Sequence, residues 1–196
     1  MAQLEAQGTC NAKAVGSNPT VGTSAREEEI EMYQSATYGN LEIEQVPEKI
    51  KDYFEKMKHF DTPFKMTVGS DSQSFDTLKL VNVIAVTCER HGGIFFYEIT
   101  RLPRTNDVRQ KLTTETNESL QAMMKLTEIL EGDEYAELRG KMSVAIHIDA
   151  GWNPDGKTRE LIPELVGWIK GCTTNCAVEI KPDAYVASTI ADKISK

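Results

Sequence analysis

Three segments of strand-forming residues follow one another directly, with no helical segment between them. Residues 65–71, 78–90 and 94–99 are rich in Val, Ile, Phe, Tyr and Thr, which favour a pleated, half-buried backbone. A turn near Asp76 and a His-Gly-Gly sequence at 91–93 leave only short links between them. Links this short join antiparallel neighbours, whereas parallel neighbours need a long crossover. The chain is therefore expected to begin its sheet with three antiparallel strands.

The rest of the chain alternates helices and strands. Apolar residues recur at helical spacing over 107–131, and the strand at 142–149 is apolar nearly throughout, as in strands covered on both faces. A helix to about Lys170, a short strand at 177–180 and a helix at 184–195 follow. We therefore expect an α/β fold with a mixed five-strand sheet, in which three antiparallel strands precede an α-β-α-β-α run and helices cover both faces.

The first 45 residues carry no sustained period of a helix or a strand. Their start is rich in Ala, Gly, Ser, Thr and Asn, so residues 1–45 are expected to form a disordered extension. A sequence encoding Gly16–Pro19 resembles the T-arm of a transfer-RNA gene, so a further hypothesis is a misassigned start, with Met32 as the native one. The expected domain spans 46–196 and opens with an added helix at about 46–60.

Four acids occupy comparable places in this element order. Asp71 and Asp149 end the first and fourth strands, Glu115 leans toward the apolar stripe of the long helix, and Asp183 opens the last helix. The order resembles the ribonuclease H-like fold, whose metal site draws acids from these places. Two divalent ions about 4 Å apart need oxygen ligands from several elements, and Mg²⁺ or Mn²⁺ prefers carboxylates. We predict Asp71, Glu115, Asp149 and Asp183 as metal ligands and catalytic residues.

A set of motifs runs from about residue 66 to the C-terminus. It consists of Val68-Gly69-Ser70-Asp71-Ser72-Gln73, Gly92-Gly93 with Phe95, Phe96 and Tyr97, Glu115-Thr116, His147-Ile148-Asp149, Gly167, Gly171, Lys181-Pro182-Asp183-Ala184-Tyr185 and Ser188-Thr189-Ile190-Ala191-Asp192-Lys193. This set resembles the YkuK-type ribonuclease H-like proteins of bacteria. The resemblance implies the fold and a nuclease-type site, but no particular substrate. The loop Ala150–Pro154 is bulkier than the family pattern, which bears on substrate access.

Each of the acids also has an alternative, purely structural interpretation. Asp71 could cap a turn through its own backbone, and Asp183 could be the N-cap of the last helix. Glu115 could bridge to Lys111, four residues earlier on the same helix. Asp192 lies nine residues after Asp183 and about half a turn out of phase with it, so it ranks below the four predicted ligands.

Other residues near these acids have two interpretations as well. His147 shares a strand face with Asp149, and a core histidine bonded to its surroundings is favoured over a metal ligand. Lys157 and Arg159 could hold phosphate or simply be solvated. Trp152 could stack a nucleic-acid base or cover its own loop.

Composition and charge limit the class of protein. The net charge is −8, but residues 1–45 hold seven acids and two bases, which leaves 23 acids and 20 bases beyond them. Charge alone therefore neither requires nor excludes a nucleic-acid partner. No apolar run approaches a membrane span, and no export signal opens the chain, so a cytoplasmic protein with reduced cysteines and no membrane partner is expected.

The acids lead to one principal function and two rivals. The principal expectation is a divalent-metal-dependent nuclease that hydrolyses phosphodiester bonds of DNA or RNA. The first rival is a catalytically silent ribonuclease H-like module that binds nucleic acid or another partner, because a fold does not determine function. The second rival is a metal-binding regulatory protein.

Overall fold

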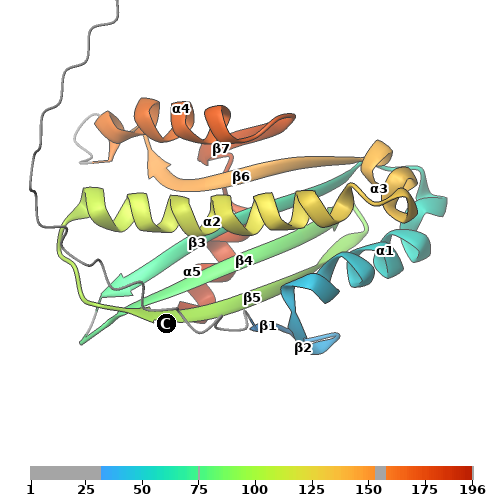
Figure 1. The fold of residues 1–196 in the computed structure, drawn as a ribbon, viewed down its shortest axis with the longest axis horizontal. Coiled ribbons are helices and arrows are strands. Elements are labelled where there is room, and N and C mark those ends of the chain that lie inside the picture. The colour runs from blue at the N-terminus through green and yellow to red at the C-terminus, as the bar shows by residue number, and fades with distance from the viewer. Residues whose placement is uncertain (1–31, 75, 153–157, 196) are drawn as a thin grey trace, which may run out of the picture.

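The computed structural model describes residues 32–74, 76–152 and 158–195, and every strand in these ranges belongs to one sheet. The strands are β1 (Met32–Ser35), β2 (Gly39–Glu42), β3 (Phe64–Ser74), β4 (Leu78–Cys88), β5 (Gly92–Leu102), β6 (Met142–Gly151) and β7 (Cys176–Lys181). The α-helices are α1 (Val46–Met57), α2 (Val108–Leu130), α3 (Ala136–Lys141), α4 (Ile162–Cys172) and α5 (Val186–Ser195). Figure 1 shows α2 crossing one face of the sheet and α5 lying behind it on the other.

The strand order is β2-β1-β5-β4-β3-β6-β7, and its last five members confirm the predicted mixed sheet. β3, β4 and β5 are consecutive antiparallel neighbours. β6 runs parallel to β3, and β7 runs parallel to β6. The helices α2 and α4 provide the crossovers that parallel neighbours require.

The sheet has two more strands than predicted, because β1 and β2 form a hairpin that pairs with β5. The expected disorder of residues 1–45 is therefore wrong for residues 32–45, while residues 1–31 lie outside the described residues. Tyr33, Leu41 and Ile43 are buried in the main core. β1 and β2 have only four residues each, and the alternation at Leu41-Glu42-Ile43-Glu44 runs into the 3-10 helix Ile43–Gln45. Tertiary packing, rather than a sustained sequence pattern, therefore reveals the hairpin.

Gly69 of β3 lets α5 pack directly on the sheet. A Cβ at this position would lie 2.9 Å from the Cβ of Ala187 on α5 and 2.9 Å from the Cβ of His147 on β6. Ala187 and Ala191 are both fully buried in a small cluster against β4. Small residues thus bring α5 close to β3, beside the strand segment that carries Asp71.

Gly69→Ala is expected to lower the free energy of unfolding by about 1–3 kcal/mol, because the added methyl group overpacks this contact. Gly167→Ala on α4 is the matched control, since no heavy atom lies within 4 Å of a Cβ placed there. The control should be neutral or more stable by up to about 1 kcal/mol, as for other glycines replaced inside helices. Urea denaturation of both variants tests the contact, and equal effects would contradict it.

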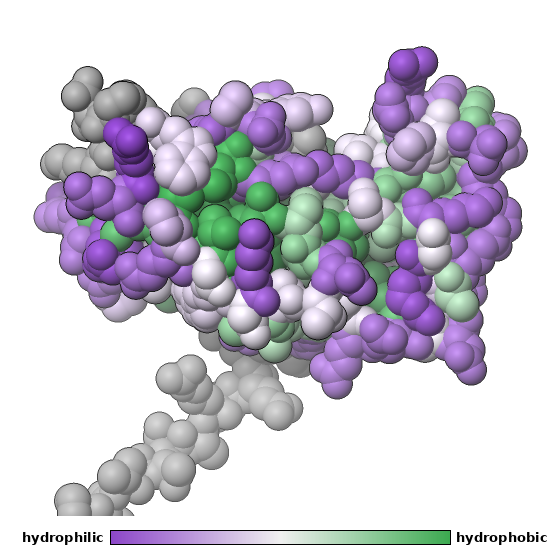
Figure 2. All heavy atoms as spheres, turned by 90° about the horizontal axis from the view of Figure 1, so that it is seen from above, coloured by the Kyte–Doolittle hydropathy of each residue, from purple (hydrophilic) through white to green (hydrophobic). Residues whose placement is uncertain are grey.

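The β7 side of the sheet is partly shielded by α4. β7 is the last strand of the described sheet, and its own Val178 and Ile180 are half-buried, as are Val166 and Trp168 of α4. Viewed from above, apolar side chains gather across the middle of the face and hydrophilic ones surround them (Figure 2).

None of the helices in the described ranges has the length and apolar character that crossing a membrane requires.

Candidate functional site

The site lies where β3 and β6 separate. Their parallel pairing ends with Gly69 opposite His147, after which β3 continues beside β4. β6 becomes irregular after Ile148, where its pairing with β7 shifts. Asp71 and Asp149 each lie two residues beyond the last β3–β6 pair, so both border the gap between the strands.

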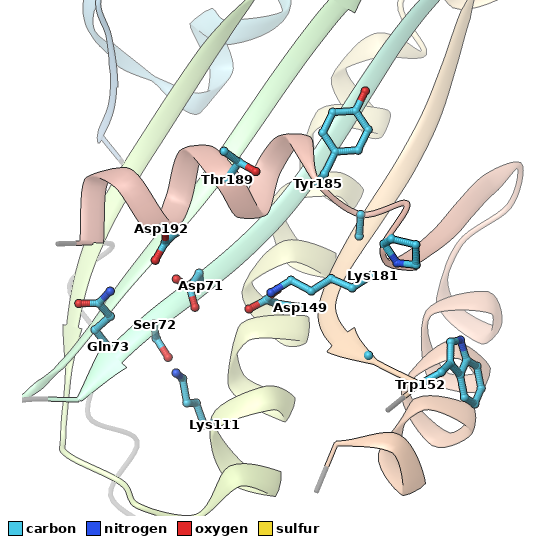
Figure 3. Close-up of a pocket in the computed structure, with 13 residues that line it drawn as sticks. Asp71, Ser72, Gln73, Lys111, Asp149, Trp152, Lys181, Tyr185, Thr189 and Asp192 are labelled. Carbon is cyan, nitrogen blue, oxygen red and sulfur yellow. The ribbon is translucent and has the colours of Figure 1, made fainter. Parts of the chain in front are cut away.

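A cavity of about 890 Å³ occupies this gap. Its lining includes Asp71, Asp149 and Asp192, which come from β3, β6 and α5. Lys111 of α2 and Lys181 of β7 also line it. Figure 3 shows Asp192 above Asp71 and the Lys181 side chain reaching Asp149. Three elements on one side of the sheet thus direct carboxylates toward one pocket, which we call the carboxylate pocket.

Asp71 is the electrostatic centre of the carboxylate pocket. Burial raises the pKa of its carboxyl group above the ordinary value, and the charges of Asp149 and Asp192 raise it further. The ammonium group of Lys111 and the backbone N–H of Ser72 lower the pKa of Asp71 in part. Three like charges therefore interact across the gap, an arrangement that a bound cation would stabilise.

Glu115 approaches from α2, on the opposite face of the sheet. It is buried, its Oε1 accepts a 2.6 Å hydrogen bond from the Ser72 hydroxyl, and it lies 3.7 Å from Lys111 Nζ. Burial raises the pKa of Glu115 to about 7, with further increases from Asp71 and Asp149, although Ser72 and Lys111 oppose the rise. The ion pair between Lys111 and Glu115 considered above is therefore present. The Glu115 carboxyl also interacts electrostatically with both pocket aspartates, Asp71 and Asp149.

A buried chain of polar groups holds α2 in register with β3. Tyr33 Oη donates to Asn82 Oδ1, and Asn82 Nδ2 donates to Ser70 Oγ, both at 2.9 Å. Ser119 Oγ donates its one proton to the carbonyl of Glu115. In the 2.9 Å hydrogen bond between Ser70 Oγ and Ser119 Oγ, Ser70 is therefore the donor. This chain links the N-terminal hairpin to the helical turn that carries Glu115.

Two lysines neutralise part of the negative charge. Lys181 Nζ forms an ion pair with Asp149 Oδ1, yet this buried oxygen has no partner with hydrogen-bond geometry. Lys111 lies beside Glu115, as described above. The Lys181 side chain is 52% exposed, so it can leave Asp149 for solvent at little cost in burial. An ammonium group therefore stands where a cation bound to Asp149 would lie.

Asp183 is not among the residues that line the carboxylate pocket, although Pro182 and Ala184 on either side of it are. Asp183 is exposed, and its N–H donates to the carbonyl of Ile180 at 2.9 Å in the turn after β7. The helix begins three residues later, so Asp183 is not its N-cap either. Tyr185, Thr189 and Asp192 line the pocket instead, and their spacing of four and three residues is that of one helix face.

Comparison with known proteins gives one match. The model of a family described as ribonuclease H-like matches residues 45–196. The chain belongs to the ribonuclease H-like family. No curated protein and no solved structure matches the chain. The matched part begins just before α1, so the N-terminal hairpin precedes the ribonuclease H-like domain.

The donor chemistry of this ribonuclease H-like domain fits a hard divalent cation. Asp71, Asp149 and Asp192 offer only oxygen ligands, and Asp149 Oδ1 is buried without a hydrogen bond. Nowhere in the described ranges, however, are three His, Cys, Asp or Glu side chains already gathered closely enough to hold a metal ion. Because Lys181 contacts Asp149, metal binding there requires this ammonium group to move away.

His147 is a core residue that fastens α5 to the ribonuclease H-like sheet. Its Nδ1 accepts from the Ala187 N–H at 3.4 Å, so its Nε2 carries the proton that is shared with Glu179 at 2.9 Å. Burial lowers the pKa of His147, while Glu179 opposes this change. Lys65 also pairs with Glu179, at 2.5 Å. The favoured interpretation of His147 agrees with these contacts.

The basic residues at the pocket differ from the two considered as phosphate ligands from the sequence. Lys157 lies outside the described residues, and Arg159 is exposed at the start of a short 3-10 helix, outside the pocket lining. Lys111 and Lys181 line the pocket instead. The sequence indicates Lys111 only as the partner of Glu115, one helical turn later, and not as a pocket cation. Lys181 could be recognised as a pocket residue only from the fold, because it approaches Asp149 from a neighbouring strand.

Glu115→Gln is expected to change how stability depends on pH. A carboxyl with a raised native pKa stabilises the folded state at low pH, and this contribution is lost as pH rises through that pKa. For Glu115 the pKa rises from 4.5 to about 7, so metal-free protein should lose up to about 3 kcal/mol between pH 4.5 and 8. Glutamine still accepts from Ser72 and carries no charge, so the variant should lack this loss.

Urea unfolding of both proteins in EDTA, at several pH values from 5 to 8, measures the difference. The variant should be the more stable at pH 8, and the gap should close toward pH 5. His147 titrates in both proteins, so its contribution cancels in the difference. Parallel stability curves would contradict the raised pKa of Glu115.

Proposed function

We propose that this domain is a divalent-metal-dependent nuclease that hydrolyses phosphodiester bonds of DNA or RNA. The observation that carries the proposal is the convergence of Asp71, Asp149 and Asp192 on one open pocket, with Glu115 coupled to it from the other face. Carboxylates concentrated in this way favour a bound cation. The ribonuclease H-like family includes nucleases, and the motif resemblance to its YkuK-type members supports the same proposal.

The geometry suggests a role for each acid. Asp71 interacts with both Asp149 and Asp192, so we assign it as the ligand shared by two ions and its neighbours as the ligands on either side. Asp192 thus takes the fourth place that the sequence predicts for Asp183. Bound Mg²⁺ or Mn²⁺ would supply an activated water and stabilise charge on the leaving oxygen. Glu115, with a pKa of about 7, can hold or release a proton near neutral pH.

Lys181 has two partners in this proposal. It neutralises Asp149 in the protein alone, and it is free to bind a phosphate oxygen of the substrate once a cation takes its place. Because Lys181 can bind the phosphate only after a cation has replaced it at Asp149, substrate binding would depend on metal binding.

A catalytically silent nucleic-acid-binding module is the second candidate. It is favoured by the ion pairs of Lys181 with Asp149 and Lys111 with Glu115, which already neutralise two of the acids. It is also favoured by the absence, within the described residues, of three gathered metal-binding side chains. In that case the pocket would bind nucleic acid without cleaving it, and divalent metal would have little effect.

A cleavage panel distinguishes the two candidates. Single-stranded, duplex, hybrid and branched oligonucleotides are incubated with the protein in Mn²⁺, Mg²⁺ or EDTA. The proposed nuclease should cleave at least one substrate in Mn²⁺ and none in EDTA. Asp71→Asn protein, purified identically, controls for contaminating nucleases and should be inactive. Binding of a substrate with no metal-dependent cleavage would instead support the silent module.

A further inference from the structure

Two exposed aromatic side chains stand at the rim of the carboxylate pocket. Trp152 is 54% exposed and Tyr185 is 67% exposed, and both line the pocket. Trp152 directly follows β6, and Tyr185 directly precedes α5. Figure 3 shows the two rings on either side of Lys181. The rim therefore carries aromatic surface from two separate elements.

The exposure of these two rings is not a general feature of the surface. The other large apolar side chains that are exposed in the described ranges, Met32, Phe60, Ile99 and Met124, are between 37% and 43% exposed. The two most exposed members of the set thus meet at a single pocket. Apolar surface concentrated beside a polar site is typical of ligand binding.

The backbone that presents each ring is held in place. The Tyr185 N–H donates to the carbonyl of Asp183, and its own carbonyl accepts from the Thr189 N–H, both at 2.9 Å. Gly151, just before Trp152, pairs with Lys181 across β6 and β7. Rings on anchored backbone lose little entropy when a ligand stacks on them.

The surroundings of the rings indicate the ligand. Exposed aromatic faces stack on the bases of single strands, whereas the bases of a duplex are already stacked on one another. Lys111 and Lys181 are cations suited to phosphate within the same pocket. We infer that the pocket binds single-stranded nucleic acid, with unpaired bases on Trp152 and Tyr185 and the intervening backbone directed toward the carboxylates. This inference rests on the proposed nuclease function, whose substrate class it names.

Binding without turnover tests the inference. Fluorescence anisotropy measures the affinity of the protein for labelled single-stranded DNA, single-stranded RNA and duplex DNA in Ca²⁺, a hard cation that takes oxygen ligands as Mg²⁺ does. Gels of the same samples check that the strands stay intact. Trp152→Ala and Tyr185→Ala should each weaken single-strand binding by about ten-fold or more, from the usual contribution of a stacked base. Trp152→Phe and Tyr185→Phe keep an aromatic face and should retain affinity within about three-fold.

Met124→Ala is the matched control, because Met124 is exposed on α2 and lies outside the carboxylate pocket. It should bind single strands as the wild type does, and duplex affinity should be the same for all variants. Single-strand binding that survives both alanine substitutions would overturn the inference, as would a preference for duplex or no single-strand binding at all.

The outcomes separate this inference from the proposed function. Ring-dependent binding of single strands with no cleavage in Mn²⁺ would leave the inference standing and remove the nuclease. Metal-dependent cleavage of duplex DNA that is indifferent to both rings would remove the inference and leave the nuclease. A difference between the DNA and RNA arms would identify which single strand the pocket prefers.

Discussion

Asp71→Asn is expected to lower metal-dependent cleavage by more than about 100-fold. Loss of residues that only orient metal ligands commonly costs about 10- to 100-fold, and a ligand shared by two ions should cost more. Metal-free stability should stay level or rise, because burial and the charges of Asp149 and Asp192 already disfavour the ionised form of Asp71. Initial rates in Mn²⁺ and urea unfolding in EDTA measure the two effects on the same preparations.

The turn-cap interpretation predicts opposite results. Loss of a side-chain cap typically costs about 0.5–2 kcal/mol of stability and would leave any cleavage intact. The structure already places Asp71 within β3, opposite Val81 of β4, and not in the turn. Asp76→Asn is the matched control, since Asp76 is exposed between β3 and β4 and outside the pocket lining. A destabilised but active Asp71→Asn protein would remove the metal site at its centre.

The second large effect distinguishes the two acids near α5. Asp192→Asn should lower cleavage by about ten-fold or more, because Asp192 lines the pocket and interacts with Asp71. Asp183→Asn should leave the rate within about two-fold, as expected for an exposed side chain outside the site. The two variants carry the same chemical change nine residues apart, so each controls for the other.

Single-turnover rates in Mn²⁺ compare the two variants, and unfolding curves confirm that both are folded. The reverse ranking, with Asp183→Asn inactive and Asp192→Asn active, would show that the C-terminal turn and α5 rearrange when metal binds. It would also restore the fourth ligand predicted from the sequence.

The five core strands could be predicted because their signals are local. Long strand-forming runs, short links and glycine-containing turns are sufficient to define β3, β4 and β5, and the apolar run of β6 indicates a strand covered on both faces. The hairpin at residues 32–42 lacks such a signal, since β1 and β2 have four residues each and Tyr33 and Leu41 are their only buried apolar residues. Its position is determined by packing against distant elements.

The acids show the same division between local and long-range information. Asp71 and Asp149 were recognisable as carboxylates that follow apolar strand residues. What sets them apart is the separation of β3 from β6 after Gly69, a tertiary feature that no local pattern encodes. The sequence ranks Asp192 below Asp183 because the two would lie about half a turn out of phase on one helix. The comparison does not apply, since α5 begins at Val186 and Asp183 lies outside it.

Thermal unfolding of the wild type with increasing Mn²⁺ tests the metal site most directly. A cation that binds only the folded protein stabilises it by mass action, by about 2.7 kcal/mol at 100 times the dissociation constant. The melting temperature should therefore rise with the logarithm of the Mn²⁺ concentration, and Asp71→Asn should lose most of this rise. An unchanged melting temperature of the wild type at millimolar Mn²⁺ would contradict a metal site at Asp71, Asp149 and Asp192.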